Sequence, residues 1–188
     1  MARRTRKQIT LDDPRAIRAL SHPARIAVID ELYGGRVATS TELAGLTGLT
    51  PSAMSYHMRA MERLGIVERD EGVTDARERP WRAAGKGLNV STLTTRAQQA
   101  AVALLTSALL DAQHRDLDAY VATEPELPEE WRAKVGLSSG TAYLTATETK
   151  ELITALEAAA EPFRRKGRRR RRGTRRVRIS HLVVPIID

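Results

Sequence analysis

Residues 41–65, TELAGLTGLTPSAMSYHMRAMERLG, decide how this chain folds. The stretch contains two helical patterns separated by Gly48, a residue suited to a tight turn. Residues 39–42, TSTE, resemble a capping box in front of the first pattern, and Pro51 suits the first position of the second. Apolar residues then recur at helical spacing until Gly65, namely Met54, Met58, Met61 and Leu64. The stretch therefore predicts a helix, a glycine-containing turn and a second helix.

Such a pair of helices has a known use. The short turn sets the second helix at a steep angle to the first, and its N-terminal residues can meet base edges in the DNA major groove. The outward residues here are mostly small or hydroxylic, whereas a helix that faces only solvent usually carries Glu and Lys pairs. A solvent-facing helix of a small bundle is the alternative interpretation of the periodicity. The outward positions are Thr50, Ser52, Ala53, Ser55, Tyr56 and Arg59.

The segments on either side extend this pattern. Asp12-Asp13-Pro14 is a helix-start signal, and Ser21 is a candidate cap for a second helix that ends at Gly34-Gly35. After Gly65, residues 66–69 predict a short strand and residues 79–83 a return strand with a proline that suits a sheet edge. A hairpin directly after the reading helix is the wing of a winged helix-turn-helix. Two arginines near its tip can reach phosphates or the minor groove, Arg77 and Arg79.

Residues 22–32, HPARIAVIDEL, together with residues 41–69 and the charged hairpin, resemble the ArsR-like winged helix-turn-helix regulators. The resemblance covers roughly residues 12–90. Its matching positions are His22, Pro23, Arg25 and Ile26 in the first stretch, and Ser55, His57, Met58, Met61, Gly65, Ile66 and Val67 in the second.

The resemblance implies a bacterial-type transcriptional regulator that binds a pseudo-palindromic operator sequence-specifically as a homodimer. It implies a repressor, and activation is the alternative. It also puts His57 on the DNA-facing stretch, although His57 packed and hydrogen-bonded beside Met58 is the alternative. Many members of the family sense metals through paired cysteines, and this chain has none. His114 lies near Asp111, Asp116 and Asp118, but a solvated helix face explains these residues more simply. We expect neither a metal site nor a cofactor.

The second half of the chain predicts a dimerisation helix followed by a small α+β unit. Residues 94–120 contain no Gly or Pro and are rich in Ala and Leu, so they predict one long helix. Apolar side chains on more than one side of this helix favour pairing with a second copy, and packing on the chain's own C-terminal half is the alternative. Strands are expected at residues 141–144 and 177–184, with a helix at 145–163 between them. The expected dimer contacts are Val102, Leu105, Leu109 and Leu117.

The charge is concentrated in two short segments. Residues 164–178, RRKGRRRRRGTRRVR, hold ten arginines and one lysine, whereas residues 8–163 hold 16 basic and 22 acidic side chains. Gly167 and Gly173 mark the arginine-rich segment as a loop, which can add salt-sensitive affinity but offers no ordered donors for reading bases. The rival function is an RNA- or ribosome-associated protein anchored by its arginine-rich segments.

These observations define the expected organisation. The fold class is a mainly α winged helix-turn-helix with a β-hairpin wing, a long dimerisation helix and a small α+β C-terminal unit. No catalytic constellation is recognisable, so we expect no enzyme activity. The absence of cysteines and of long apolar segments favours a cytoplasmic protein without a membrane partner, and the C-terminal unit leaves room for an unknown small-molecule effector. The expected segments are a basic arm at 1–11, the DNA-binding domain at 12–90, the dimerisation helix at 91–122, and the effector or dimerisation unit at 123–188 with its arginine-rich loop at 164–176.

Overall fold

The computed structural model describes residues 7–70, 79–90, 94–166 and 172–187, and of residues 165 and 166 it describes the backbone alone. The chain divides into two compact units, Met1–Ala112 and Gln113–Asp188. The boundary between them falls inside one long helix. Each unit is therefore described by itself.

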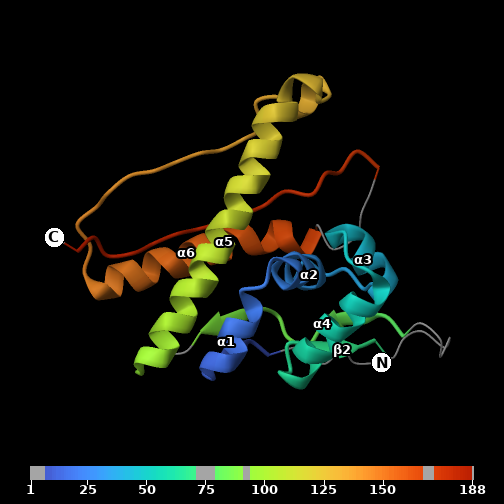
Figure 1. The fold of residues 1–188 in the computed structure, drawn as a ribbon. Coiled ribbons are helices and arrows are strands. Elements are labelled where there is room, and N and C mark those ends of the chain that lie inside the picture. Colours follow the sequence, from blue (N-terminus) through green and yellow to red (C-terminus); the bar gives the residue numbers. More distant parts are fainter. Residues whose placement is uncertain (1–6, 71–78, 91–93, 167–171, 188) are drawn as a thin grey trace, which may run out of the picture. The chain divides into compact units, whose positions relative to one another are not determined.

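The first unit contains short helices whose starts follow from their capping residues (Figure 1). The helices are α1 Pro14–Leu20, α2 Pro23–Tyr33, α3 Ser40–Thr47 and α4 Pro51–Arg63. The Asp13 side chain accepts a hydrogen bond from the Arg15 amide at 2.8 Å, as the helix-start signal predicts. Thr39 and Glu42 form the expected capping box, and Gly48 ends α3 with φ +69°. This left-handed residue turns the chain sharply between α3 and α4.

The cap of α2 differs from the prediction. His22, not Ser21, is the N-cap residue, and its Nδ1 accepts a hydrogen bond from the Ala24 amide at 3.2 Å. Ser21 lies one residue too early and instead ends α1, where its amide donates to the Arg18 carbonyl. An imidazole nitrogen thus replaces the hydroxyl that usually accepts at this position.

Two small sheets complete the first unit. Strand β2, Val67–Arg69, pairs antiparallel with β3, Trp81–Ala83, as the predicted hairpin requires, with Glu68 opposite Arg82. Strand β1, Ile9–Leu11, pairs parallel with β4, Leu88–Val90. The sequence pattern instead puts residues 9–11 in a basic arm. A three-residue strand is too short for a recognisable alternation, and its partner lies far along the chain, so neither feature is visible in the sequence.

One hydrophobic core lies between the helices and the hairpin of the first unit. The three methionines of α4 are fully buried, as their spacing predicts. Trp81 is also fully buried, and its Nε1 donates to the Ser40 hydroxyl at 2.9 Å. The backbone of Trp81 pairs with that of Ala38 in both directions. The hairpin is thus fixed to the chain just before α3.

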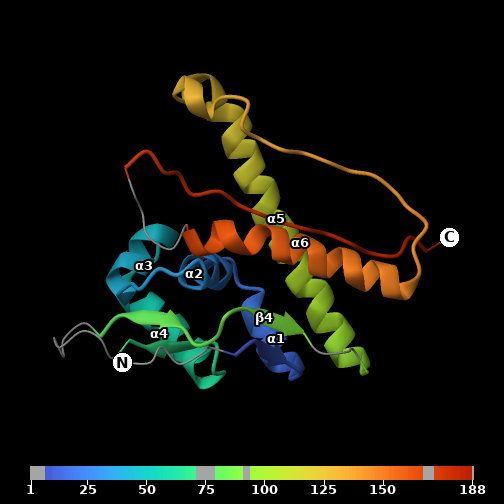
Figure 2. The same ribbon diagram turned by 180° about the vertical axis from the view of Figure 1, so that it is seen from behind.

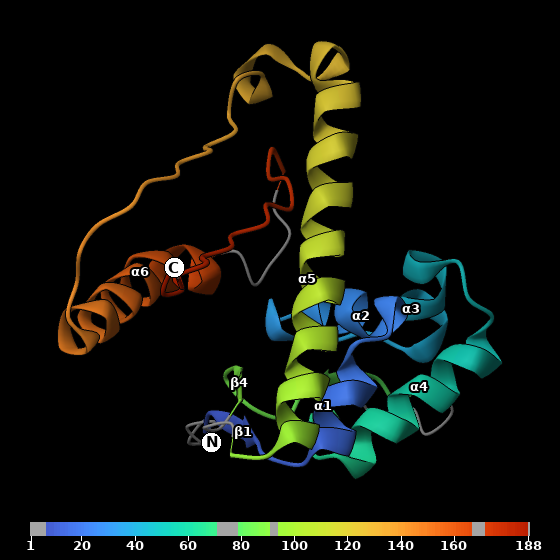
Figure 3. The same cartoon turned by 60° about the vertical axis from the view of Figure 1, so that its left-hand side comes forward.

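The long helix α5, Arg96–Thr123, occupies the region where the sequence predicts one (Figure 3). Gln98 organises its first turn from a buried position. Its Oε1 lies 3.0 Å from both the Thr94 and Thr95 amides, and its Nε2 donates to the Asp12 carbonyl at 2.7 Å. The start of α5 is therefore hydrogen-bonded to Asp12, two residues before α1 begins.

The regular secondary structure described in the second unit is helical, and residues 134–145 and 174–187 form neither helix nor strand. After the 3₁₀ turns Glu124–Glu126 and Glu129–Trp131, the helix α6 spans Ala146–Lys166 and opens with a capping box of Thr145 and Glu148 (Figure 2). The strands expected at 141–144 and 177–184 are not formed, so the α+β prediction for this unit is wrong among the described residues. A strand needs a neighbour to pair with its amides and carbonyls, and alternation of side chains does not supply one.

The second unit also has little apolar core. Ala160 is the only buried hydrophobic residue among its described residues. Apolar side chains of α6 are largely open, because Leu152 is 40% exposed and Ala159 is also exposed. No helix in the described part of the chain is long and apolar enough to cross a membrane.

Candidate nucleic-acid interface

Helix α4 presents a polar face because its opposite face is held in the core. The Thr50 hydroxyl caps the helix by accepting from the Ala53 amide at 3.2 Å. The C-terminal end is fixed by Tyr33, whose hydroxyl donates to the Ile66 carbonyl at 2.7 Å. With the methionines buried, the exposed side chains of α4 lie on the other faces of the helix.

The predicted DNA-facing residues fall into two groups. Thr50, Ser52, Tyr56 and Arg59 are exposed, and Tyr56 keeps 65% of its surface accessible. Ala53, Ser55 and His57 are half-buried. The exposed group offers two hydroxyls, one phenol and one guanidinium, which can contact base edges and phosphates.

His57 is held by other side chains of the domain. Its Nδ1 accepts a hydrogen bond from Arg25 Nε at 3.2 Å, and its ring centroid lies 4.5 Å from that of His22. The ring of Tyr56 meets it edge-on at 5.9 Å. Partial burial lowers the pKa of His57, and the nearby His22 and Arg25 lower it further. The alternative interpretation of a packed, hydrogen-bonded histidine describes this environment.

Arg25 is the residue whose role the sequence reasoning missed. Besides His57, it contacts the end of α1, because its Nη1 donates to the Ala19 carbonyl at 2.7 Å. Burial lowers the pKa of Arg25, and the Tyr56 hydroxyl opposes that effect. Arg25 is among the positions matching the ArsR-like pattern, and that match is the signal that could have found it.

The arginines at the base of the hairpin are largely engaged within the domain. The Arg69 guanidinium lies 3.5 Å from the centre of the Trp81 ring, and burial lowers its pKa. Arg82 is ion-paired with Glu68 at 2.8 Å and with Asp70 at 3.1 Å. Arg79 is exposed, and its carbonyl accepts from Arg69. The predicted wing residue Arg77 lies outside the described residues.

The four predicted dimer contacts fall into a half-buried pair and an exposed pair. Val102 and Leu105 pack against the core of the first unit. Leu109 and Leu117 are each 37% exposed. Leu104 and Leu110, at 51% and 36%, are further exposed leucines on the same helix. Part of the apolar surface of α5 thus stabilises the chain's own domain, and part is open.

Described residues of the arginine-rich segment make contacts inside the second unit. Arg178 forms an ion pair with Asp116, and the Arg175 guanidinium lies 5.9 Å from the centre of the Trp131 ring. Residues 167–171 of the predicted loop lie outside the described residues.

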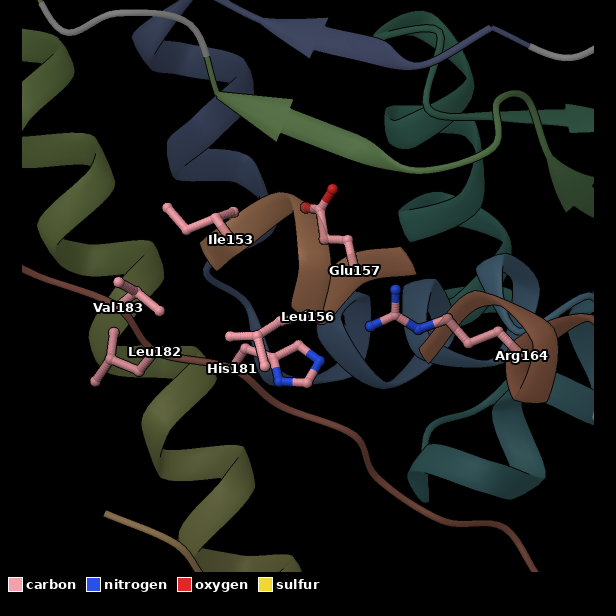
Figure 4. A pocket seen from close by; sticks show the side chains of 7 residues that line it. All are labelled: Ile153, Leu156, Glu157, Arg164, His181, Leu182 and Val183. Atoms are coloured by element: carbon pink, nitrogen blue, oxygen red, sulfur yellow. The ribbon is translucent and has the colours of Figure 1, made fainter. Parts of the chain in front are cut away.

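The second unit also contains a hollow of about 330 Å³ between α6 and the C-terminal segment (Figure 4). Its polar lining side chains are Glu157, Arg164 and His181. Leu182 on its wall is 67% exposed, so the hollow is open to solvent. Within the described residues, no group of three or more His, Asp or Glu side chains is arranged to hold a metal ion.

Helices α3 and α4, the turn at Gly48 and the hairpin that follows define a helix-turn-helix domain with a wing. A family model described as a helix-turn-helix domain matches residues 20–70. This range contains both helices, Arg25, His57 and the first hairpin strand.

The HTH-type transcriptional regulator YgaV of Escherichia coli (strain K12) is 36% identical over 52 residues, which are 28% of this chain and 52% of YgaV. The chain thus spans about half the length of this curated relative. Among solved structures, a single-site mutant of Lactococcus lactis ZitR is 15% identical, with 75% of this chain and 73% of ZitR covered and a TM-score of 0.31. The Mycobacterium tuberculosis MarR family protein Rv2887, in complex with salicylic acid, is 22% identical, with 78% and 85% covered and a TM-score of 0.31. At these scores the structural similarity carries no further argument.

Proposed function

We propose that this protein is a DNA-binding transcriptional regulator of the ArsR-like kind. The observation that carries the proposal is the division of α4 into two faces, with Met54, Met58 and Met61 fully buried and Tyr56 and Arg59 exposed. A helix anchored in this way behind a turn and in front of a hairpin can enter the major groove without unfolding the domain. The YgaV similarity, which lies in the same class of domain, supports the proposal.

The finer proposal is a homodimeric repressor on a pseudo-palindromic operator. Two copies related by a two-fold axis would bring their α4 helices to half-sites about 10 bp apart. The exposed leucines of α5, Leu104 and Leu109, support pairing with a second copy, because burying them removes apolar surface from water. Repression would follow from occlusion of polymerase. We further propose that the protein acts in the cytoplasm, has no enzyme activity, and carries any effector site in its C-terminal unit.

The test starts from duplex DNA selected for binding out of a random library. Arg59→Ala should weaken binding to the selected duplex by about 10- to 100-fold, the range for one base-reading guanidinium, and change random-duplex binding little. Arg77→Ala should weaken both equally and reduce the slope of log affinity against log salt by about one. Arg96→Ala, at an exposed arginine that begins α5, is the matched control. If neither test variant changes affinity more than the control does, the proposed reading face is wrong.

The rival proposal, an RNA- or ribosome-associated protein, rests on the arginine-rich segment. Arginine-rich segments bind RNA without a folded platform. Deletion of residues 164–176 separates the two proposals. The rival predicts loss of nearly all nucleic-acid binding, whereas the regulator retains its preference for the selected duplex with a smaller salt dependence.

A further inference from the structure

Arg25 connects the reading helix to the helices behind it. Its guanidinium donates from Nε to His57 Nδ1 at 3.2 Å and from Nη1 to the Ala19 carbonyl at 2.7 Å. The first partner belongs to α4 and the second to the last turn of α1, while Arg25 itself lies on α2. One rigid, planar group thus joins three helices. We refer to the Arg25 and His57 pair as the Arg25–His57 bridge.

The bridge requires a particular protonation state of His57. An imidazole nitrogen accepts a hydrogen bond only when it carries a lone pair, so the proton of neutral His57 lies on Nε2. The neighbouring His22 ring is constrained in the same way, because its Nδ1 accepts from the Ala24 amide. A proton added to His57 Nδ1 removes the acceptor and puts a second cation beside Arg25. The bridge therefore exists only with neutral His57.

We propose that Arg25 is a positioning residue that holds α4 in its DNA-reading orientation through neutral His57, and that protonation of His57 releases this orientation. This inference rests on the proposed function. If His57 instead contacted DNA directly, DNA affinity would change with pH in the opposite direction. A histidine that contacts phosphate binds DNA more tightly when it is protonated, because it gains a positive charge. The bridge requires specific binding to weaken on acidification.

The partial burial of His57 and its neighbours His22 and Arg25 also favour the neutral form of the ring. His22 and Arg25 from α2 face the ring, and Tyr56 on α4 meets it edge-on. Desolvation, His22 and Arg25 lower the pKa of His57 below its unfolded value of 6.5. The unfolded chain therefore binds a proton at this site more readily than the folded chain. The stability that neutral His57 contributes is complete above pH 6.5 and is lost as pH falls through 6.5 toward the lower folded value.

The binding experiment compares the dissociation constant for the selected duplex at pH 7.5 and pH 5.5. Wild type should bind the selected duplex more weakly at pH 5.5 than at pH 7.5, because protonation of His57 removes the acceptor for Arg25 and favours the released state. His57→Gln should stay within about threefold of wild type at pH 7.5, because its amide oxygen accepts from Arg25, and should lose the pH dependence. Arg25→Lys keeps the charge without the planar fork and should bind weakly already at pH 7.5.

Two histidine variants serve as controls. His114→Gln, at an exposed position on α5, should show the same pH dependence of DNA binding as wild type. His22→Asn retains a side-chain cap for α2 and should keep the direction of the pH dependence with a smaller size, because His22 is one of the groups that lower the pKa of His57. Thermal unfolding of each variant at both pH values separates release of α4 from loss of the fold. A wild-type affinity that rises on acidification, or a pH dependence that survives in His57→Gln, would overturn the proposal.

A measurement without DNA distinguishes failure of this inference from failure of the proposed function. Nitrogen and carbon NMR of the free protein should show His57 with its proton on Nε2 and a pKa below 6.5. Arg25→Gln removes the nearby positive charge and should raise that pKa. If selection from the random library yields no duplex that wild type binds, but these NMR results hold, the proposed function fails and the Arg25–His57 bridge stands. A His57 proton on Nδ1 would contradict the bridge directly.

Discussion

Replacing Trp81 with phenylalanine tests the contact that fixes the hairpin to the helix-turn-helix domain. Trp81 is fully buried, its Nε1 donates to Ser40 at 2.9 Å, and the Arg69 guanidinium lies 3.5 Å from its ring centre. Phenylalanine keeps an aromatic ring at the site but loses the donor and the second ring. The change therefore affects a hydrogen bond, core volume and a cation–π contact together.

The expected cost follows from these three contributions. The lost hydrogen bond costs about 1 kcal/mol. The cavity left by the missing ring adds roughly 1–2 kcal/mol, and the weaker cation–π contact about 0.5 kcal/mol. We expect Trp81→Phe to lower the free energy of unfolding of the first unit by about 3 kcal/mol. For a domain of this size, that corresponds to a fall of roughly 15 °C in Tm.

Urea unfolding followed by far-ultraviolet circular dichroism measures this cost, and Trp131→Phe is the matched control. Trp131 is half-buried in the second unit, and its replacement should change the unfolding of the first unit by less than about 0.5 kcal/mol. Ser40→Ala should cost about 1 kcal/mol alone and much less in the Trp81→Phe background. A Trp81→Phe cost below about 0.5 kcal/mol, or full additivity with Ser40→Ala, would refute the reasoning.

Two further predictions concern the turn before α4 and the N-terminal cap of α4. Gly48→Ala should destabilise the domain by about 1 kcal/mol in urea unfolding, because alanine is strained at φ +69°. Gly45→Ala, inside α3 with open space around its Cβ position, should stabilise by about 0.5 kcal/mol, and the same sign at both glycines would contradict the left-handed turn at Gly48. Thr50→Ala should cost about 1 kcal/mol by removing the acceptor for the Ala53 amide, whereas Thr50→Ser should stay close to wild type. Equal costs for the alanine and serine variants would show that the cap contributes nothing.

The sequence predicts the helices of the first unit because their signals are local. Asp13, the Thr39–Glu42 capping box and Gly48 each act within a few residues, and the methionine spacing identifies the buried face of α4 directly. The hairpin strands are predictable for the same reason, since they flank one loop. Most of the helix-turn-helix domain can therefore be predicted from signals within a few residues of each helix end.

The structure differs from the sequence-based predictions where the conformation of a segment depends on a partner distant in sequence. Strand β1 depends on β4, and residues 177–184 have a strand-like pattern without forming a strand. His57 has the helical position of a DNA-facing residue, yet Arg25, thirty-two positions earlier, holds it. Helical periodicity alone does not determine whether a polar side chain faces solvent or meets another polar side chain inside the fold.

Gln98 connects the first turn of α5 to α4 indirectly, through α1 and Arg25. Its side chain bonds α5 to the Asp12 carbonyl ahead of α1, and the other end of α1 supplies the Ala19 carbonyl to Arg25. Any binding event that tilts the start of α5 must either break the Gln98 bond or carry α1 with it. Under the proposed function, α1 and Arg25 would then carry a displacement of α5 to the DNA-contacting helix α4. By linkage this coupling would also act in reverse, because DNA bound to α4 would restrict the movement of α5.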